Sequence, residues 1–229
     1  MDLEDLRAVT TTATDRQVLS AYRAGLFPMG IGRGGSGRMG WWGPRRRGVL
    51  LPGDLKVSKS LRKSLRGFEF TVDESFGEVI RACAEPSRPG GWITREIIGL
   101  YEGLFDDGWA HSIEVRRDGR LVGGLYGVAI GSLFAGESMF HRDRDASKAA
   151  LVHLVALLDG EQEPDAAWVA GGPRTDGATS DDGPDWLIDT QWQTPHLATL
   201  GVSEISGLDY AARLESALRG NRAQRILNK

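Results

Sequence analysis

The stretch GGLYGVAIGSLFAGESMFHR, residues 123–142, decides the fold of this chain. Most of it is apolar or glycine, and Ile130-Gly131-Ser132 divides it into two runs that predict two strands joined by a turn. Its one carboxylate, Glu137, lies between Phe134 and Met139. A carboxylate among apolar side chains is costly unless it is paired or used. The stretch therefore predicts a hairpin that carries a functional acid.

The segments around this hairpin predict an α+β fold. Strands are expected at 111–116, 120–130 and 133–138, which together form an antiparallel meander. Apolar residues spaced i, i+3, i+4 and i+7 predict a helix over 146–158, with Asp145 as its N-cap. The other expected elements are a helix at 14–24, short strands within 47–57, a helix at 59–66, a strand at 68–72, helices at 74–84 and 94–107, a strand at 186–190, a helix at 194–200, a strand at 202–206 and a helix at 208–219.

Local signals predict where several of these helices start. Thr14, Ser58 and Thr94 each precede a predicted helix and supply the side-chain oxygen that an N-cap requires. Gln17 follows Thr14 by three residues and completes a capping box. Residues 1–13 show no regular pattern, so we expect them to be frayed.

The element order divides the chain into two expected domains. A small N-terminal domain is predicted over 1–46, and a larger domain over 47–229 with an N-acetyltransferase-like (GNAT-like) sheet that opens where an acyl donor lies. Acetyl-CoA is not the expected donor, because residues 142–145 hold no glycine that would let backbone N–H groups close on phosphates. Residues 160–185 carry seven acids and no apolar pattern, which predicts a mobile acidic insertion.

Composition narrows the class of protein. The 229 residues are 41% hydrophobic, enough for one large domain or a medium domain plus a small one. The single cysteine, Cys83, excludes an internal disulfide and fits a reducing compartment. The start of the chain does not resemble a signal peptide, and no apolar run has membrane length. We expect a cytoplasmic monomer with no membrane contact, no metal site and no cofactor, since the four histidines lack metal-ligand spacing.

One segment departs from the overall net charge of −3. Residues 33–66 hold ten basic residues and one acid, a local charge of +9, with Trp41 and Trp42 among them. Basic residues interleaved with aromatic rings supply phosphate contacts and stacking planes for a nucleic acid. A solvated basic face over two buried tryptophans is an equally good interpretation of the composition alone.

A second polar feature lies on the predicted 186–190 strand and just beyond it. Asp189 and Gln191 are two residues apart, so their side chains are expected on one face, with Ile188 on the other. A carboxylate and an amide that point together from a central strand indicate a site. The alternative is an edge strand with one solvated face.

Nine motifs, in order along residues 18–210, resemble the leucyl/phenylalanyl-tRNA–protein transferases. They are AYRAGLFP, WWGPRRRGVLLP, WIT, HSIEV, GGLYGVAIG, FAGESMFHR, DASKAAL, LIDTQ and HLATLG. Such enzymes move Leu, Phe or Met from aminoacyl-tRNA to a protein whose first residue is Arg or Lys, which marks that protein for N-degron proteolysis. The resemblance implies the same activity here, with the 3′ end of aminoacyl-tRNA and such acceptor proteins or peptides as partners.

The resemblance also implies roles for residues at matching positions. Asp189 and Gln191 match the catalytic pair, and Glu137 matches the carboxylate beside the aminoacyl group. Trp92 matches a residue that stacks near the terminal adenosine. The apolar amino-acid pocket is implied to consist of Leu125, Phe134, Met139, Leu151, Leu154, Leu158 and Ile188. The basic helix that faces tRNA is implied to carry Lys59, Arg62, Lys63 and Arg66.

The chemistry of such a transfer fits these residue types. An aminoacyl ester is already activated, so neither ATP nor a metal is needed. The attacking α-amine has a pKa of about 7.7–8, so the site needs to hold it neutral and place it on the ester carbonyl. Asp189, oriented by Gln191, is one candidate to accept the proton. An orienting role for Asp189, with a relay through the adenosine 2′-hydroxyl, is the alternative, and Glu137 or Asp189 would attract a cationic acceptor.

Two other functions remain open at this point. One is an aminoacyl-tRNA-dependent transferase with a different acceptor, such as a cell-wall peptide or an acidic N-terminus. The other is a non-catalytic tRNA-binding or regulatory protein on the same fold. Intact Glu137, Asp189 and Gln191 argue against the second.

Overall fold

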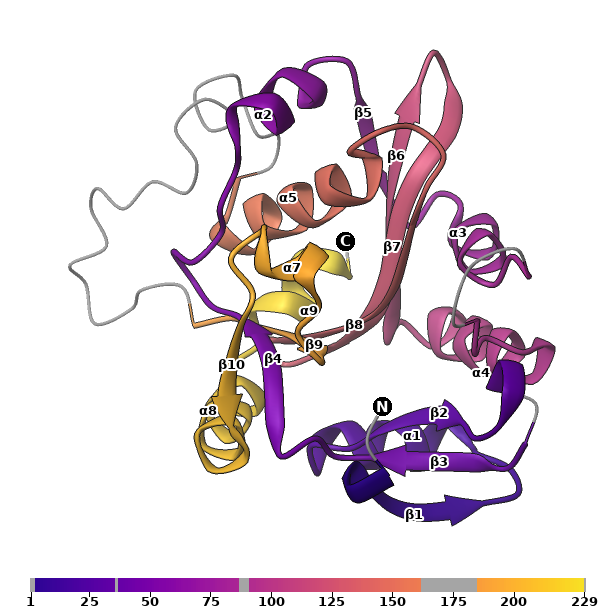
Figure 1. The fold of residues 1–229 in the computed structure, drawn as a ribbon. Helices are drawn as coiled ribbons and strands as arrows, with labels where there is room; N and C mark the ends of the chain where they lie inside the picture. Colours follow the sequence, from indigo (N-terminus) through magenta and orange to yellow (C-terminus); the bar gives the residue numbers. More distant parts are fainter. Residues whose placement is uncertain (1–2, 36, 87–90, 162–184, 229) are drawn as a thin grey trace.

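A seven-stranded sheet runs through the molecule (Figure 1). The structure is a computed structural model that describes residues 3–35, 37–86, 91–161 and 185–228. The strand order is β10-β4-β9-β8-β7-β6-β5, and every pair is antiparallel except β8 with β9, which is parallel. The strands are β4 (Arg46–Leu50), β5 (Glu69–Val72), β6 (Ala110–Arg117), β7 (Arg120–Ile130), β8 (Leu133–His141), β9 (Leu187–Gln191) and β10 (Ser203–Ser206).

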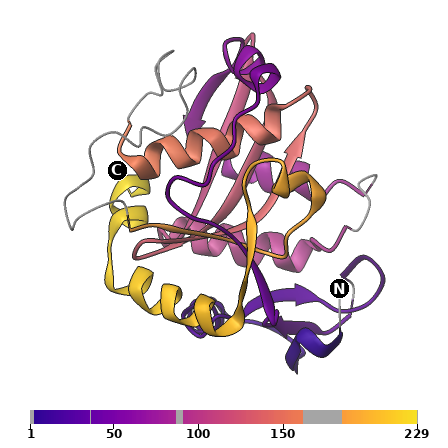
Figure 2. The same ribbon diagram turned by 60° about the vertical axis from the view of Figure 1, so that its left-hand side comes forward.

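Helices cover both faces of this sheet. The α-helices are α1 (Asp15–Arg23), α2 (Lys59–Leu65), α3 (Phe76–Cys83), α4 (Arg95–Asp106), α5 (Ala146–Asp159), α7 (Pro195–Ala198), α8 (Gly207–Arg219) and α9 (Arg222–Leu227). Figures 1 and 2 show α5 lying across one face, with α3 and α4 on the other. The predicted α+β class is therefore confirmed.

Residues 123–142 form the centre of the sheet. β7 and β8 pair along their length, with Leu125 opposite Met139 and Ala129 opposite Phe134. Leu125 and Ala129 belong to the core under α5, whereas Tyr126 belongs to the core under α3 and α4. β7 is buried on both faces from its second residue onward, which explains its nearly continuous apolar sequence.

A three-stranded sheet near the N-terminus packs with α1 below the large sheet (Figure 1). Its strands are β1 (Leu6–Thr10), β2 (Phe27–Gly30) and β3 (Met39–Trp42), in the order β1-β3-β2. None of them was predicted, and the expectation of a frayed start is wrong for residues 3–10, where a short 3-10 helix (Leu3–Asp5) leads into β1. β2 and β3 are buried at every residue, and β1 is largely exposed. None of the three strands therefore shows the alternation of buried and exposed residues by which a strand is predicted from sequence. The domain boundary at 46 stays a prediction.

The predicted N-caps are confirmed at three helices and wrong at one. Thr14, Ser58 and Thr94 each accept a backbone N–H, and Thr14 forms the expected capping box. Asp145 makes no side-chain cap on α5. Its backbone is left-handed, with φ of 67°, and its carboxylate accepts a hydrogen bond from Ser64 at 2.8 Å instead, so it links α5 to α2.

Helix α9 was not expected, and it packs against α5, β7 and β8. Most of the acidic insertion expected at 160–185 lies outside the described residues. In the described parts of the chain, no helix combines the length and the apolar character needed to span a bilayer.

The turn at Gly201 offers a test of the packing between β10 and the chain before α2. Gly201 has φ of +100°, and a Cβ there would overlap the carbonyl oxygen of Asp54. We expect Gly201→Ala to lower the free energy of unfolding by about 1–3 kcal/mol. Gly99→Ala is the control, because a Cβ on this exposed site in α4 meets no atom within 4 Å, and it should stabilise the protein by about 0.5–1 kcal/mol. Urea unfolding measures both, and equal stability of the two variants would contradict this account.

Candidate active site

A cavity of about 240 Å³ opens where β8 and β9 diverge. The two strands pair only from Leu133 with Leu187 to Ala135 with Asp189. Beyond that point, residues 136–139 of β8 line one side of the cavity, and Thr190 and Gln191 line the other. Residues of α5 and the α7 region close it. The interruption of the sheet therefore creates the space.

Most of the predicted apolar pocket lies around this cavity. The residues that line it from the predicted set are Leu125, Phe134, Met139, Leu151, Leu154 and Ile188. Leu158 does not line it. One helical turn beyond Leu154, Leu158 is fully buried in the core, where Arg222 donates a hydrogen bond to its carbonyl oxygen. The assignment of Leu158 to the pocket stays a prediction.

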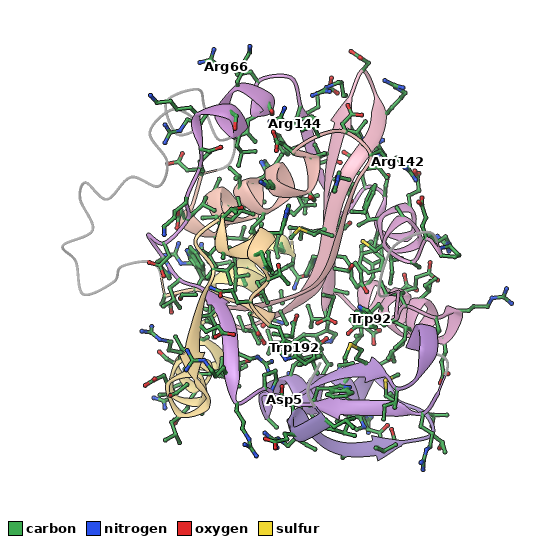
Figure 3. The ribbon with its side chains drawn as sticks, in the orientation of Figure 1. Asp5, Arg66, Trp92, Arg142, Arg144 and Trp192 are labelled. Carbon is green, nitrogen blue, oxygen red and sulfur yellow. The ribbon has the colours of Figure 1, made fainter. Side chains whose placement is uncertain are left out.

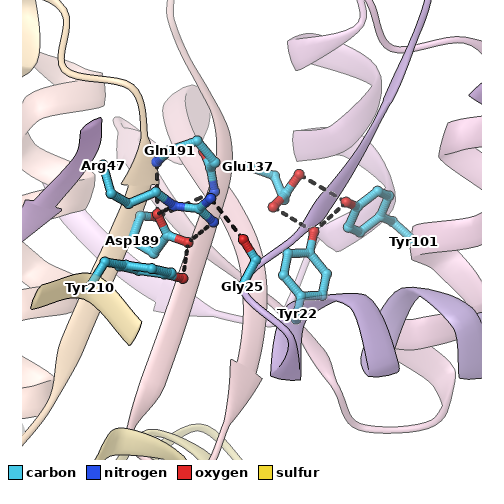
Figure 4. A network of polar contacts seen from close by, with 8 residues as sticks. All are labelled: Tyr22, Gly25, Arg47, Tyr101, Glu137, Asp189, Gln191 and Tyr210. Carbon is cyan, nitrogen blue, oxygen red and sulfur yellow. Dashed lines mark hydrogen bonds and ion pairs between the residues drawn. The ribbon is translucent and has the colours of Figure 1, made fainter. Parts of the chain in front are cut away.

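Glu137 is the one acidic residue that lines the cavity within the described residues. It is half-buried, and each of its carboxylate oxygens contacts one tyrosine (Figure 4). Tyr22 lies 2.6 Å from Oε1, Tyr101 lies 2.8 Å from Oε2, and the two hydroxyl oxygens lie 2.6 Å apart. Tyr22 comes from α1 and Tyr101 from α4, so the N-terminal part of the chain completes the surroundings of Glu137.

Burial and hydrogen bonding act in opposite directions on the proton of Glu137. Burial raises the pKa of Glu137 to about 7, and the nearby charge of Asp189 also acts to raise it. The hydrogen bonds that Tyr22 and Tyr101 donate to the carboxylate act to lower this pKa. Glu137 therefore changes charge near neutral pH.

Asp189 is placed differently from Glu137. It is fully buried and is not among the residues that line the cavity. Its Oδ1 accepts from Arg47 Nε at 2.8 Å and from the backbone N–H of Gln191 at 2.9 Å. Its Oδ2 accepts from Arg47 Nη2 at 2.5 Å and from the Tyr210 hydroxyl at 2.8 Å (Figure 4). Four donors thus surround this carboxylate.

The expectation that Asp189 and Gln191 point from one face of the strand is corrected. Gln191 lines the cavity, whereas Asp189 points to Arg47. Gln191 has φ of +59°, and the pairing of β9 with β4 shifts register between Gly48 and Val49. A left-handed residue and a bulge break the two-residue alternation on which the expectation depended.

Arg47 was not predicted as a site residue, because the sequence presents it as one of three consecutive arginines in the basic segment. In the structure Arg45 and Arg46 are exposed and Arg47 is 1% exposed. No local signal in the sequence singles out Arg47, because β4 is buried at every residue from Arg47 onward and does not alternate in burial. Arg46 pairs with Glu204 on the surface, and Arg47 turns inward.

The residues predicted to contact tRNA lie outside the cavity. Lys59, Lys63 and Arg66 are exposed on or next to α2, and Arg62 is half-buried with an unpartnered Nε. Figure 3 shows Arg66 and Arg144 at the α2 end of the molecule, and Trp92 nearer the N-terminal sheet. Trp92 is half-buried and packs on the core under α3 and α4.

His196 adds a titratable group to the cavity wall. Its pKa is lowered by burial and by the nearby positive charge of Lys148, against the opposite effect of the Asp145 carboxylate. Among the described residues, no three histidine, cysteine, aspartate or glutamate side chains lie close enough together to hold a metal ion. Besides its apolar residues, the cavity lining thus includes one acid, one amide, one imidazole and the hydroxyl-bearing residues Tyr126, Ser138, Thr190 and Thr194.

Comparison with known proteins identifies the family. Residues 49–164 match the family model described as leucyl/phenylalanyl-tRNA protein transferase. The leucyl/phenylalanyl-tRNA–protein transferase of Thiobacillus denitrificans is 45% identical over 218 residues, 93% of this chain and 85% of that protein. The enzymes of Paramagnetospirillum magneticum and Chromobacterium violaceum are 45% and 42% identical, over 88% and 93% of this chain and 87% and 82% of theirs. The chain therefore belongs to the leucyl/phenylalanyl-tRNA–protein transferase family and is an enzyme of that family.

Proposed function

We propose that this enzyme transfers Leu, Phe or Met from aminoacyl-tRNA to the N-terminal Arg or Lys of acceptor proteins. The observation that carries the proposal is an apolar cavity with a single acid, Glu137, where β8 and β9 diverge. Its volume of about 240 Å³ is large enough for one apolar amino-acid side chain. Valine and isoleucine are rejected by shape and charged side chains by the cost of desolvation.

In the proposed reaction, Glu137 handles the proton. The α-amine nitrogen of the acceptor forms a bond to the ester carbonyl carbon, and the bond from that carbon to the ribose oxygen of tRNA breaks. Ionised Glu137 takes the proton that the amine loses and returns it to the departing ribose oxygen, so no proton is gained or lost overall. A pKa of about 7 suits this task, because a base is most effective when its pKa lies near the working pH. The ionised carboxylate also attracts the cationic acceptor.

For Asp189 we propose the orienting role rather than the role of base. Its two oxygens already accept four hydrogen bonds, and its side chain is fully buried. Gln191, which lines the cavity, is then the member of the pair that contacts the substrate. Its carboxamide can hydrogen-bond to the aminoacyl ester and hold the ester at the end of the cavity.

For the tRNA we propose an approach over the α2 end of the molecule. Lys59, Lys63 and Arg66 would contact phosphates there, and Trp92 would stack near the terminal adenosine. The GNAT-like organisation of the large domain, a monomeric state in the cytoplasm and a role in N-degron proteolysis belong to the same proposal. The support for the GNAT-like organisation is that the sheet opens between its two parallel strands, next to the cavity.

The acceptor class is tested by one labelling assay. Peptides that begin with Arg, Lys, Asp or Ala are incubated with the enzyme and labelled leucyl-, phenylalanyl-, methionyl- or valyl-tRNA. We expect label on the Arg and Lys peptides from the first three tRNAs, because the cavity is apolar and ionised Glu137 attracts a cationic acceptor. We expect none from valyl-tRNA, because the β-branched side chain of valine is rejected by shape. Label on the Asp peptide would instead support another acceptor. Binding of tRNA with no labelled peptide would support a non-catalytic protein.

The raised pKa of Glu137 predicts how kcat/KM depends on pH. Glu137 must be ionised to accept a proton, and its pKa is raised to about 7, so kcat/KM should fall as the pH drops through 7. The α-amine adds a second fall, below about 7.7–8. We expect Glu137→Gln to lower kcat/KM by roughly 100- to 10,000-fold and to remove the lower step from the profile.

The matched control is Glu96→Gln, which removes an exposed acid from the first turn of α4. It should leave both steps and the rate unchanged. A Glu137→Gln profile that keeps its step near pH 7 would show that another group titrates there.

If the basic residues on and next to α2 contact tRNA, their removal should change how the affinity for tRNA depends on salt concentration. Each phosphate contact contributes about 0.7–0.9 to the slope of log affinity against log salt concentration. Replacing Lys59, Lys63 and Arg66 with Gln should therefore weaken binding and lower the slope by about 2. The charge-matched control replaces three exposed arginines on α1, α8 and α9, namely Arg16, Arg213 and Arg225. Equal slopes in the two triple variants would exclude α2 as a specific tRNA contact.

A further inference from the structure

The buried Arg47 guanidinium joins parts of the chain that are far apart in sequence. It lies on β4, and all three of its nitrogens donate hydrogen bonds. Nε and Nη2 bind the two oxygens of Asp189 on β9, and Nη1 donates to the Gly25 carbonyl oxygen at 3.0 Å. The planar group also stacks on two aromatic rings, with its carbon 4.4 Å from the ring centre of Tyr210 and 5.1 Å from that of Phe27.

This arrangement holds the end of β9 in an unfavourable backbone conformation. Gln191 has φ of +59°, which non-glycine residues rarely adopt. The backbone N–H of Gln191 donates to Oδ1 of Asp189, the same oxygen that accepts from Arg47 Nε. Arg47 thus fixes the carboxylate that fixes Gln191, and Gln191 lines the cavity.

The next residue along the chain is also held by the N-terminal sheet. Trp192 donates from its indole nitrogen to Asp5 at 3.2 Å and packs edge-on against Phe27 and Trp42. Phe27 is the ring on which Arg47 stacks. The N-terminal part of the chain therefore contacts both the residue that follows Gln191 and the arginine that anchors Asp189.

We infer that Arg47 is a positioning residue of the transfer reaction, which acts through Asp189 to hold Gln191 at the cavity and which couples the N-terminal sheet and α8 to the site. The inference rests on the proposed function, because it assigns a catalytic consequence to the place of Gln191. A lysine cannot fill this role, since it has no planar fork to bind both carboxylate oxygens and the Gly25 carbonyl together.

A second cavity next to Arg47 allows a test by chemical rescue of a variant that lacks the guanidinium group. It has a volume of about 440 Å³, shares no lining residue with the first cavity, and is lined by Gly25, Arg47 and Tyr210 among others. Truncation of Arg47 would extend this cavity to the Asp189 carboxylate. Small guanidinium ions could then enter and bind both carboxylate oxygens.

The experiment compares Arg47→Ala and Arg47→Lys with the control Arg46→Ala. Arg46 is the adjacent residue of the same strand, and it is exposed. Transfer of leucine to an Arg peptide gives kcat, and the KM for leucyl-tRNA is measured in the same assay. We expect both Arg47 variants to lose about 100-fold in kcat, the usual effect of a small misplacement of a positioning group, with KM changed little. Arg46→Ala should keep the wild-type kcat.

Chemical rescue of Arg47→Ala distinguishes the loss of a positioning group from a general loss of structure. Ethylguanidinium at millimolar concentration should restore part of the kcat of Arg47→Ala and leave Arg47→Lys and Arg46→Ala unchanged. Wild-type kcat in a folded Arg47→Lys protein would overturn the inference. It would also be overturned if ethylguanidinium restored nothing to a folded Arg47→Ala protein.

A second measurement does not depend on activity. Amide hydrogen exchange at Gln191 should speed up in Arg47→Ala or Arg47→Lys and stay unchanged in Arg46→Ala. Unchanged exchange in both Arg47 variants would overturn the inference even if transfer were lost. A wild-type protein that transfers nothing, with Gln191 released in the Arg47 variants, would refute the proposed function and support the positioning role.

Discussion

The buried ion pair between Arg47 and Asp189 is the interaction on which the rest of the site depends. Removing two charges from water is costly, and their attraction compensates only when the remaining hydrogen-bonding groups are also satisfied. Here Tyr210, Gln191 and the Gly25 carbonyl satisfy them. These groups come from α8, from β9 and from the loop after α1, so the pair is stable only when these parts are assembled. Loss of either charge alone would leave the other buried and unpaired.

The cavity forms where the pairing of β8 with β9 stops, next to this ion pair. β8 and β9 pair for three residues, and the chain then turns at Gln191. That turn brings the backbone of residues 192 and 193 close over Gly48 of β4, where a Cβ would collide with it. Glycine at 48 therefore allows β9 to bend away from β8. The space between the separated strands is bounded by apolar side chains of α5 and by Glu137.

Sequence reasoning succeeded where the signals are local or periodic. The meander, the helix over 146–158 and three N-caps follow from spacing and capping chemistry, and all are confirmed. Sequence reasoning failed where contacts between residues far apart in the sequence determine the place of a side chain. Arg47 has the same local composition as Arg45 and Arg46, and only the pairing of β4 with β9 turns it inward.

The carboxylates of Glu137 on β8 and Asp189 on β9 differ because their partners differ. Asp189 faces a guanidinium, a full positive charge that compensates its own and fixes its geometry. Glu137 faces two hydroxyl groups, which donate hydrogen bonds but carry no charge, so burial raises its pKa to about 7. A carboxylate with a permanent cationic partner is suited to hold other groups in place, and one that exchanges its proton near neutrality is suited to move protons. The opposite surroundings therefore divide the two tasks, with Asp189 as the anchor and Glu137 as the group that titrates at the cavity.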